Sequence, residues 1–267
     1  MFKFLEPEKI DIVITEFFKN YFIKSNFKKA FVAVSGGVDS ATIAHLSAKI
    51  LGSDNVIAAF FPSSITSNES FEYYKQIIEK LNIKDHFEIQ IDKFLNPYIE
   101  IDKTLEQQDS KSKLRKGNIM ARIRMILSYD IASKFDALVV GTENKTEFLL
   151  GYSTQWGDSA AAFHPMGDIY KTEVFDYARF LGVDENIVKR IPTAELWQNQ
   201  TDEGEIGLRY KIIDQILFYL YEKKLEKDEI IKLGFKKEEI DRIQLLVTRS
   251  EYKRRLPLSA SFKELRE

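Results

Sequence analysis

Residues 30–50 read AFVAVSGGVDSATIAHLSAKI, and the rest of the chain is organised around this stretch. Its first five residues are apolar and include β-branched and aromatic side chains, which is typical of a buried strand. Apolar side chains then recur at helical spacing, at Ile43, Leu46 and Ile50. Between the two halves lie residues 35–40, SGGVDS. The stretch therefore predicts a strand that turns sharply into a helix.

The turn at residues 35–40 has the chemistry of a phosphate-binding loop. A helix that starts after such a turn points free backbone N–H groups and its positive dipole end at the turn, which favours an anion. The two glycines let the main chain approach a ligand, and the two serines add hydroxyl donors. Asp39 supplies a carboxylate that could hold Mg²⁺ beside phosphates. The alternative interpretation is an ordinary helix cap built from Ser and Asp.

Two better-known phosphate loops fit this turn poorly. A GxxxxGK[ST] loop needs a lysine at its end, and there is none between Lys29 and Lys49. A dinucleotide fingerprint needs a third glycine and an acid about 20 residues further on, but the next strand ends in FFPS at residues 60–63. SGGVDS resembles instead the SGGxDS loop of the N-type ATP pyrophosphatases, which split ATP into AMP and pyrophosphate to activate a carbonyl or carboxylate.

Composition narrows the classes of protein. A length of 267 residues suits one large α/β domain. The 39 basic and 41 acidic residues nearly cancel, so no nucleic-acid partner is expected. The absence of cysteine excludes disulfides and zinc–thiolate sites. No signal-peptide pattern and no run of ~18 apolar residues is present, so we expect a cytoplasmic protein with no membrane partner.

Segments in which apolar residues have helical spacing alternate along the chain with short apolar segments typical of strands. We expect strands at 30–34, 55–61, 86–91 and 137–140, and helices at 7–25, 68–81, 118–134, 171–181, 209–222 and 236–249. This order predicts an α/β fold, a Rossmann-like parallel sheet with helices on both faces. The first helix should bury Ile10, Val13, Ile14, Phe17, Phe18, Tyr21 and Phe22 on one face. The acidic stretch 198–207 is either a lid or a plain surface loop.

A second group of polar residues follows the strand at 137–140. Thr142 comes directly after this strand, where ligands sit in parallel sheets. If a helix starts near Lys145, Glu147 lies in its first turn and could add a carboxylate to the metal at Asp39, although an acid there also suits the helix dipole. Lys171 starts a helix against the dipole preference, which indicates a functional position.

Two arginines, Arg122 and Arg124, lie in a mostly apolar helix. Burying Arg without an anionic partner is costly. Because they are two residues apart, they point to different faces of the helix, and at most one should meet a given ligand.

Several motifs occur in a fixed order: SGGVDS, GN-x-x-AR-x-RM at 117–125, VVGTENKTE-x-x-x-GY at 139–152, then WGD, KTEV, PTAEL and YKRR. Together they resemble ammonia-dependent NAD⁺ synthetase over essentially the whole chain. The resemblance implies a homodimeric ligase with an adenine nucleotide alpha hydrolase-like fold. It implies that the nicotinate carboxylate of deamido-NAD⁺ is adenylated with ATP and Mg²⁺, and that ammonia then displaces AMP to give NAD⁺.

The resemblance also implies roles for individual residues. ATP would be bound by Ala33, Val34, Ser35, Gly36, Gly37, Val38, Asp39, Ser40, Thr142, Lys171 and Thr193. Mg²⁺ would be bound by Asp39 and Glu147, and deamido-NAD⁺ by Arg122, Tyr252 and Lys253. Asp158 matches an acid near the ammonia site and, with Asp39 and Lys171, completes the catalytic set, although a turn residue after glycine is an alternative for Asp158. Gln155, Ala162 and Tyr252 replace a lysine, an aspartate and a histidine of many members.

The organisation that we expect is a single domain over residues 1–267, with an N-terminal helix at 7–25, a nucleotide-binding core at about 29–195 and a C-terminal helical part at about 205–267. No glutaminase domain is expected, so free ammonia should be the nitrogen source. Two alternatives stay open. One is a pyrophosphatase of the same fold that adenylates another carboxylate or a nucleobase. The other is a nucleotide-binding regulator without turnover.

Overall fold

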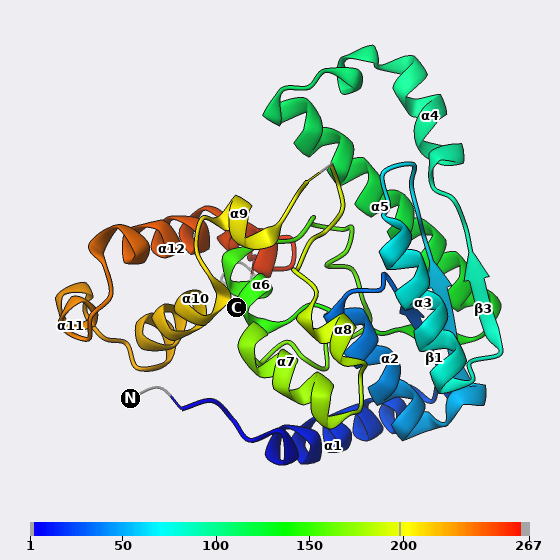
Figure 1. Ribbon diagram of the computed structural model, residues 1–267, viewed down its shortest axis with the longest axis horizontal. Helices are drawn as coiled ribbons and strands as arrows, with labels where there is room; N and C mark the ends of the chain where they lie inside the picture. Colours follow the sequence, from blue (N-terminus) through cyan, green and yellow to red (C-terminus); the bar gives the residue numbers. More distant parts are fainter. Residues whose placement is uncertain (1–2, 198, 263–267) are drawn as a thin grey trace.

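A parallel sheet lies on the right in Figure 1, between α2 (Val38–Leu51) and α3 (Asn68–Leu81) on one side and α5 (Ser110–Lys134) on the other. The computed structural model describes residues 3–197 and 199–262. The strands are β1 (Lys29–Ala33), β2 (Val56–Phe60), β3 (Asp85–Glu88) and β4 (Ala137–Val139). They pair in the order β3-β2-β1-β4, and every pair is parallel. The predicted α/β fold with a parallel sheet is confirmed.

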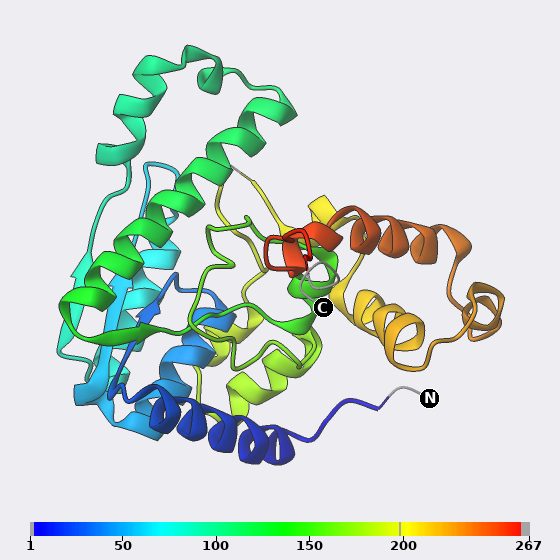
Figure 2. The same cartoon turned by 180° about the vertical axis from the view of Figure 1, so that it is seen from behind.

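Helices connect the strands and extend beyond the sheet (Figures 1 and 2). Their bounds are α1 (Pro7–Ser25), α2 (Val38–Leu51), α3 (Asn68–Leu81), α4 (Asp92–Ile101), α5 (Ser110–Lys134), α6 (Lys145–Leu150), α7 (Lys171–Phe180), α8 (Glu185–Lys189), α9 (Asp202–Ile206), α10 (Tyr210–Leu217), α11 (Lys227–Lys232) and α12 (Lys237–Arg249). Short helical turns are η1 (Ser53–Asn55), η2 (Lys103–Glu106), η3 (Phe218–Glu222) and η4 (Glu251–Arg254). The prediction for 68–81 coincides with α3, whereas α4 lies where the sequence predicts no helix.

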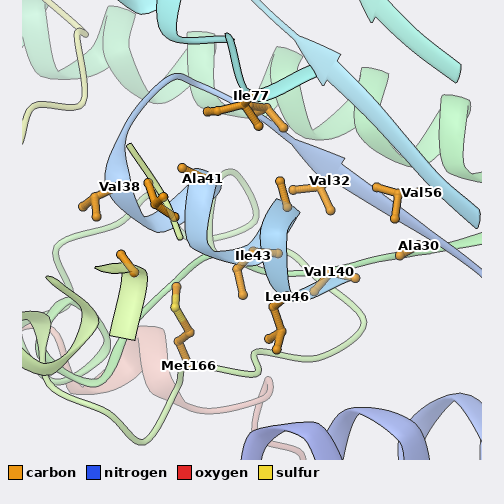
Figure 3. Packing of buried hydrophobic residues seen from close by; sticks show 14 of the residues in the cluster. Ala30, Val32, Val38, Ala41, Ile43, Leu46, Val56, Ile77, Val140 and Met166 are labelled. Carbon is orange, nitrogen blue, oxygen red and sulfur yellow. The ribbon is translucent and has the colours of Figure 1, made fainter. Parts of the chain in front are cut away.

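Successive strand residues point to opposite faces of the sheet, and each face has its own core. Ala30 and Val32 of β1 belong to the core that α1, α2, α3 and α7 cover, and Figure 3 shows both beside residues of α2. Phe31, between them, belongs to the core under α4 and α5. Both faces of the sheet are therefore buried by helices, as in other all-parallel sheets.

The apolar face of α1 is narrower than its sequence predicts. Ile10, Ile14 and Phe18 are buried in the core, but Val13 is 67% exposed and Phe17 is 45% exposed. The prediction that both would be buried is wrong, because only residues three to four apart on one line of the helix reach the sheet. The helix thus presents a second apolar line to solvent.

The C-terminal helices form a third core beside α6. Leu150 of α6 packs in one cluster with Ile213 of α10 and Ile243 of α12. α9 lies within the stretch 198–207, for which the sequence indicates only a lid or a loop; residue 198 lies outside the described residues. Among the described residues, the helices are all too short or too polar to span a lipid bilayer.

Candidate active site

A cavity of about 290 Å³ lies at the carboxyl ends of β1 and β4. This is the edge where parallel α/β sheets bind ligands. Its lining includes these residues singled out in the sequence: Ala33, Val34, Ser35, Gly37, Val38, Asp39, Ser40, Thr142, Glu147, Asp158, Lys171 and Thr193. Gly36, Arg122, Tyr252 and Lys253 are not part of this lining. The structure therefore brings together residues from both halves of the chain.

The turn between β1 and α2 is held by its own serines. The Ser35 backbone N–H donates to Ser40 Oγ at 3.0 Å, and the Ser40 hydroxyl donates to the Gly37 carbonyl at 3.0 Å. Gly36 has φ +82°, and a Cβ there would lie 2.5 Å from the Ser70 carbonyl oxygen of α3. Only glycine fits this close approach. The serines thus shape the turn around the start of α2 in addition to offering hydroxyl groups.

Lys171 joins the two halves of the site. It is the first residue of α7 and only 1% exposed. Its Nζ donates to the carboxylates of Asp39 and Glu147, the second at 3.0 Å. Burial alone would lower the pKa of Lys171, but the charges of these two carboxylates raise it well above its ordinary value. Lys171 is therefore a permanent cation at the base of the cavity.

Asn144 fixes the two carboxylates relative to each other. Its side-chain amide donates to Asp39 Oδ1 at 2.9 Å, and its Oδ1 accepts from the Glu147 backbone N–H at 3.1 Å. The Glu147 carboxylate in turn accepts from the Asn144 backbone N–H, which completes a capping box at the start of α6. Burial raises the pKa of Glu147, and the charge of Lys171 opposes that rise. The spacing of Asn144 and Glu147 could have revealed this cap in the sequence.

The carboxylate oxygens at this site suit a metal ion whose remaining ligands come from a substrate. One carboxylate oxygen of Asp39 and one of Glu147 contact the same atom, the Nζ of Lys171. Within residues 3–197 and 199–262, no three His, Cys, Asp or Glu side chains are grouped as in a closed metal site. Mg²⁺ usually takes one or two carboxylates together with phosphate oxygens and water. The two carboxylates therefore fit Mg²⁺ that arrives with a nucleotide.

The two arginines of α5 point in different directions, as expected. Arg122 is exposed, and its Nη2 donates to the Gln155 carbonyl at 3.1 Å. Arg124 lines the cavity and donates from Nε to the Phe61 carbonyl at 3.1 Å. Arg124 makes no ion pair with any residue that the structure describes. Its guanidinium is therefore a cation available to an anion inside the cavity.

Asp158 lies in the cavity wall, where its residue is exposed, and a buried carboxylate, Glu143, lies near it. The Thr154 backbone N–H donates to Asp158 Oδ1 at 2.7 Å, and burial raises the pKa of this carboxylate. Burial also raises the pKa of Glu143 to about 7. Lys253 lies near both acids, and its Nζ donates to the carbonyls of Gly151 and Ser153 at 2.8 and 2.6 Å. Glu143 is buried, Lys253 is half-buried and Asp158 is exposed, so the three groups make a mostly acidic region at the edge of the cavity.

A network that the sequence does not reveal closes another side of the cavity. The Arg190 guanidinium donates to Ser70 Oγ at 2.7 Å and to Glu195 Oε1 at 2.8 Å. All three residues line the cavity and come from α3 and the segment after α8. Because the partners are up to 125 residues apart, no local pattern indicates their contact. Tyr252, which the sequence singles out, is instead 61% exposed.

A parallel sheet with a glycine turn, a buried lysine and two carboxylates at its strand ends defines a nucleotide-binding α/β protein. The NAD synthase family matches the chain over residues 12–257, and the chain belongs to that family. It is similar to the NH(3)-dependent NAD(+) synthetase of Fusobacterium nucleatum, with 42% identity covering 97% of this chain and 98% of that protein. The corresponding protein of Pyrococcus furiosus is 41% identical over 91% of this chain and 93% of its own length.

Solved structures of synthetases are also similar to this chain. The NMN synthetase from Francisella tularensis superposes with a TM-score of 0.82 at 29% identity, covering 97% of this chain and 100% of that one. The NH3-dependent NAD synthetase from Campylobacter jejuni, in complex with the nitrate ion, superposes with a TM-score of 0.78 at 28% identity, covering 96% and 100%.

Proposed function

We propose that this protein amidates deamido-NAD⁺ to NAD⁺ with ammonia and ATP, through an adenylated carboxylate, and releases AMP and pyrophosphate. The observation that carries this proposal is the buried cluster of Asp39, Glu147 and Lys171 beside the SGGVDS turn. A cation and two metal-binding carboxylates at a helix N-terminus are the groups that a nucleoside triphosphate requires. Membership of the NAD synthase family supports the choice of substrate.

The first step converts a poor electrophile into a reactive one. A carboxylate oxygen of the substrate attacks the α-phosphorus of ATP, and the bond to pyrophosphate breaks. Lys171 and the turn at residues 33–40 would hold the phosphates, with Thr142 and Thr193 on the same cavity wall. Mg²⁺ held by Asp39 and Glu147 would neutralise charge on the phosphates. The chain's own contribution is therefore to place the carboxylate in line with the leaving group.

The second step replaces AMP by an amide. The nitrogen lone pair of ammonia attacks the carbonyl carbon, and the carbon–oxygen bond to AMP then breaks. Ammonia is mostly ammonium at neutral pH, so a carboxylate must bind it and accept a proton. Asp158 lines the cavity and fits that role. The 267 residues hold no cysteine that could act as the nucleophile of a thiol-type glutaminase, so we infer that the nitrogen comes from free ammonia.

The remaining part of deamido-NAD⁺ would extend beyond the cavity. Arg122, Tyr252 and Lys253 lie outside its lining, and the first two are exposed. Arg122 would contact the substrate from α5, while Tyr252 and Lys253 would do so from η4. This assignment rests on the family motif, and it leaves the phosphate end of the cavity to ATP.

We also propose that the protein is a homodimer. Three apolar side chains on adjacent turns of α1 are left open to solvent: Ile12 is 66%, Val13 67% and Phe17 45% exposed. Contiguous exposed apolar surface often marks a protein interface. A second copy would cover these side chains, and Val13→Lys should then give a monomer in light scattering. An unchanged molecular mass would contradict this interface.

The function is tested by incubating the purified protein with MgATP, ammonium and one acid at a time, and by measuring pyrophosphate, AMP and the amide. Deamido-NAD⁺ should give equal amounts of all three products. Nicotinate mononucleotide and free nicotinate are the comparison acids, the former because of the similarity to an NMN synthetase. ATP binding without pyrophosphate release from any acid would favour a regulatory protein instead.

A further inference from the structure

Asp214 is a fully buried carboxylate outside the cavity. It lies in α10 with 0% of its surface exposed. Among the described residues it forms no ion pair, so nothing neutralises its charge directly. Burial raises the pKa of Asp214 to about 6, and the hydrogen bonds from Thr146 and Thr172 oppose that rise. Retaining such a group is costly unless its hydrogen bonds are satisfied.

Among the described residues, the hydrogen bonds of its carboxylate go to the starts of two helices. Asp214 Oδ1 accepts from the Thr146 hydroxyl at 2.5 Å. Asp214 Oδ2 accepts from the Thr172 backbone N–H at 2.9 Å and from the Thr172 hydroxyl at 2.6 Å. Thr146 Oγ1 also accepts from the Lys171 backbone N–H at 2.9 Å. One carboxylate thus ties the first turn of α6 to the first turn of α7.

The two threonines are next to the residues that form the phosphate end of the cavity. Thr146 precedes Glu147 in α6, and Thr172 follows Lys171 in α7. The side chains of Glu147 and Lys171 meet at 3.0 Å. Any change in the position of α6 relative to α7 would therefore alter this contact and the place of both groups beside Asp39.

We propose that Asp214 is a positioning residue that holds Glu147 and Lys171 in register for MgATP, through Thr146 and Thr172. This inference rests on the proposed function. It links the C-terminal helices to the nucleotide site, because Asp214 lies in α10, whose residue Ile213 packs in one core with residues of α6 and α12. Partners behind a metal-binding or phosphate-binding group commonly change affinity by about 10–100-fold when removed.

The test is MgATP binding by titration calorimetry, with the half-saturating Mg²⁺ concentration and thermal unfolding measured on the same samples. Asp214→Asn keeps the shape of the side chain. It places an amide N–H, which is itself a donor, opposite the hydrogen-bond donors of Thr172. We expect it to weaken MgATP binding by about 10–100-fold and to raise the Mg²⁺ requirement. Asp241→Asn in α12, which removes an exposed carboxylate paired with Lys227, is the control and should bind as the wild type does.

A second pair of variants separates positioning from general packing. Thr146→Ser keeps the hydroxyl and should bind MgATP within about threefold of the wild type, whereas Thr146→Val should reproduce the loss seen with Asp214→Asn. If Asp214→Asn does not fold, this pair decides the question.

Equal binding by Thr146→Ser and Thr146→Val, or wild-type binding by a folded Asp214→Asn, overturns the inference alone. A wild-type protein that does not bind MgATP overturns the proposed function and this inference with it.

Discussion

Lys171 donates hydrogen bonds to Asp39 and Glu147, two carboxylates that come from different strand–helix connections of the sheet. Asp39 follows β1 and Glu147 follows β4, and these strands are neighbours. The contact is therefore a direct consequence of the sheet order. It makes one buried cation the common partner of both metal-binding candidates, and the first two predictions follow from it.

Asp39→Asn should lower kcat/KM for MgATP by about 100-fold and leave the fold intact. The substitution keeps the side chain's shape, but it removes the charge that faces Lys171 and the metal ligand. Steady-state rates over a range of Mg²⁺ concentrations and a thermal unfolding curve measure the two effects. Asp54→Asn, in a surface pair with Lys84, is the matched control and should have the rates and the unfolding curve of the wild type. Wild-type activity of Asp39→Asn would mean that the metal site lies elsewhere.

Lys171→Met should destabilise the protein by about 3 kcal/mol without metal, because it leaves two partly buried carboxylates, 19% and 16% exposed, without their cation. Added Mg²⁺ should recover part of that free energy by taking the place of the ammonium group. Urea unfolding with and without Mg²⁺ measures both. The comparison variant Lys84→Met removes a well-exposed pair and should change the free energy of unfolding by at most about 1 kcal/mol. A Lys171→Met variant as stable as the wild type would contradict the role of Lys171.

Glu143 should make folding stability depend on pH. Burial raises the pKa of this carboxyl from 4.5 to about 7, so the folded state binds its proton more tightly than the unfolded state does. The stabilisation is fully present below pH 4.5 and is lost as the pH rises through about 7. Relative to Glu143→Gln, the wild type should therefore lose about 3 kcal/mol between these limits.

Urea unfolding of the wild type and Glu143→Gln across this pH range measures the effect. Glu100→Gln, on an exposed position of α4, should follow the wild-type curve. Parallel curves for the wild type and Glu143→Gln would show that Glu143 ionises as it does in water.

Ammonium should support amidation, and glutamine alone should not. The chain contains no cysteine, and a glutaminase of the thiol type needs one as its nucleophile. Rates with equal concentrations of ammonium and glutamine, measured after removal of free ammonia from the glutamine stock, distinguish the two donors. Equal rates with purified protein would contradict this prediction.

Much of the fold could be predicted because apolar residues recur at regular spacing in most helices and strands of this chain. The strand at 30–34 lies within one residue of β1, and α3 has the predicted bounds. α4 could not be predicted, since Pro97 lies inside it and interrupts the helical pattern. α9 lies in an acidic stretch with few apolar residues, so its existence depends on tertiary contacts such as the Tyr210 hydroxyl bond to Asp202 at 3.0 Å.

The candidate site was predictable where a motif carried it and not where distant contacts form it. SGGVDS and the spacing of Glu147 and Lys171 pointed to the residues that now line one cavity. Helical spacing alone does not distinguish Arg122 from Arg124, because the choice depends on how α5 is rotated against the sheet. The family resemblance implies Arg122 as a substrate contact, whereas Arg124 is the arginine that lines the cavity. The contact of Arg190 with Ser70 joins segments 120 residues apart, and it has no counterpart in local sequence.

The central claim is that the protein activates a carboxylate by transferring AMP to it, and an oxygen-isotope measurement tests it most directly. Deamido-NAD⁺ with ¹⁸O at both carboxylate oxygen positions is converted with MgATP and ammonium. The ¹⁸O content of each product is then measured by mass spectrometry. The account predicts AMP with one ¹⁸O, an amide that keeps the other, and unlabelled pyrophosphate. Unlabelled AMP, or label found in orthophosphate, would contradict it.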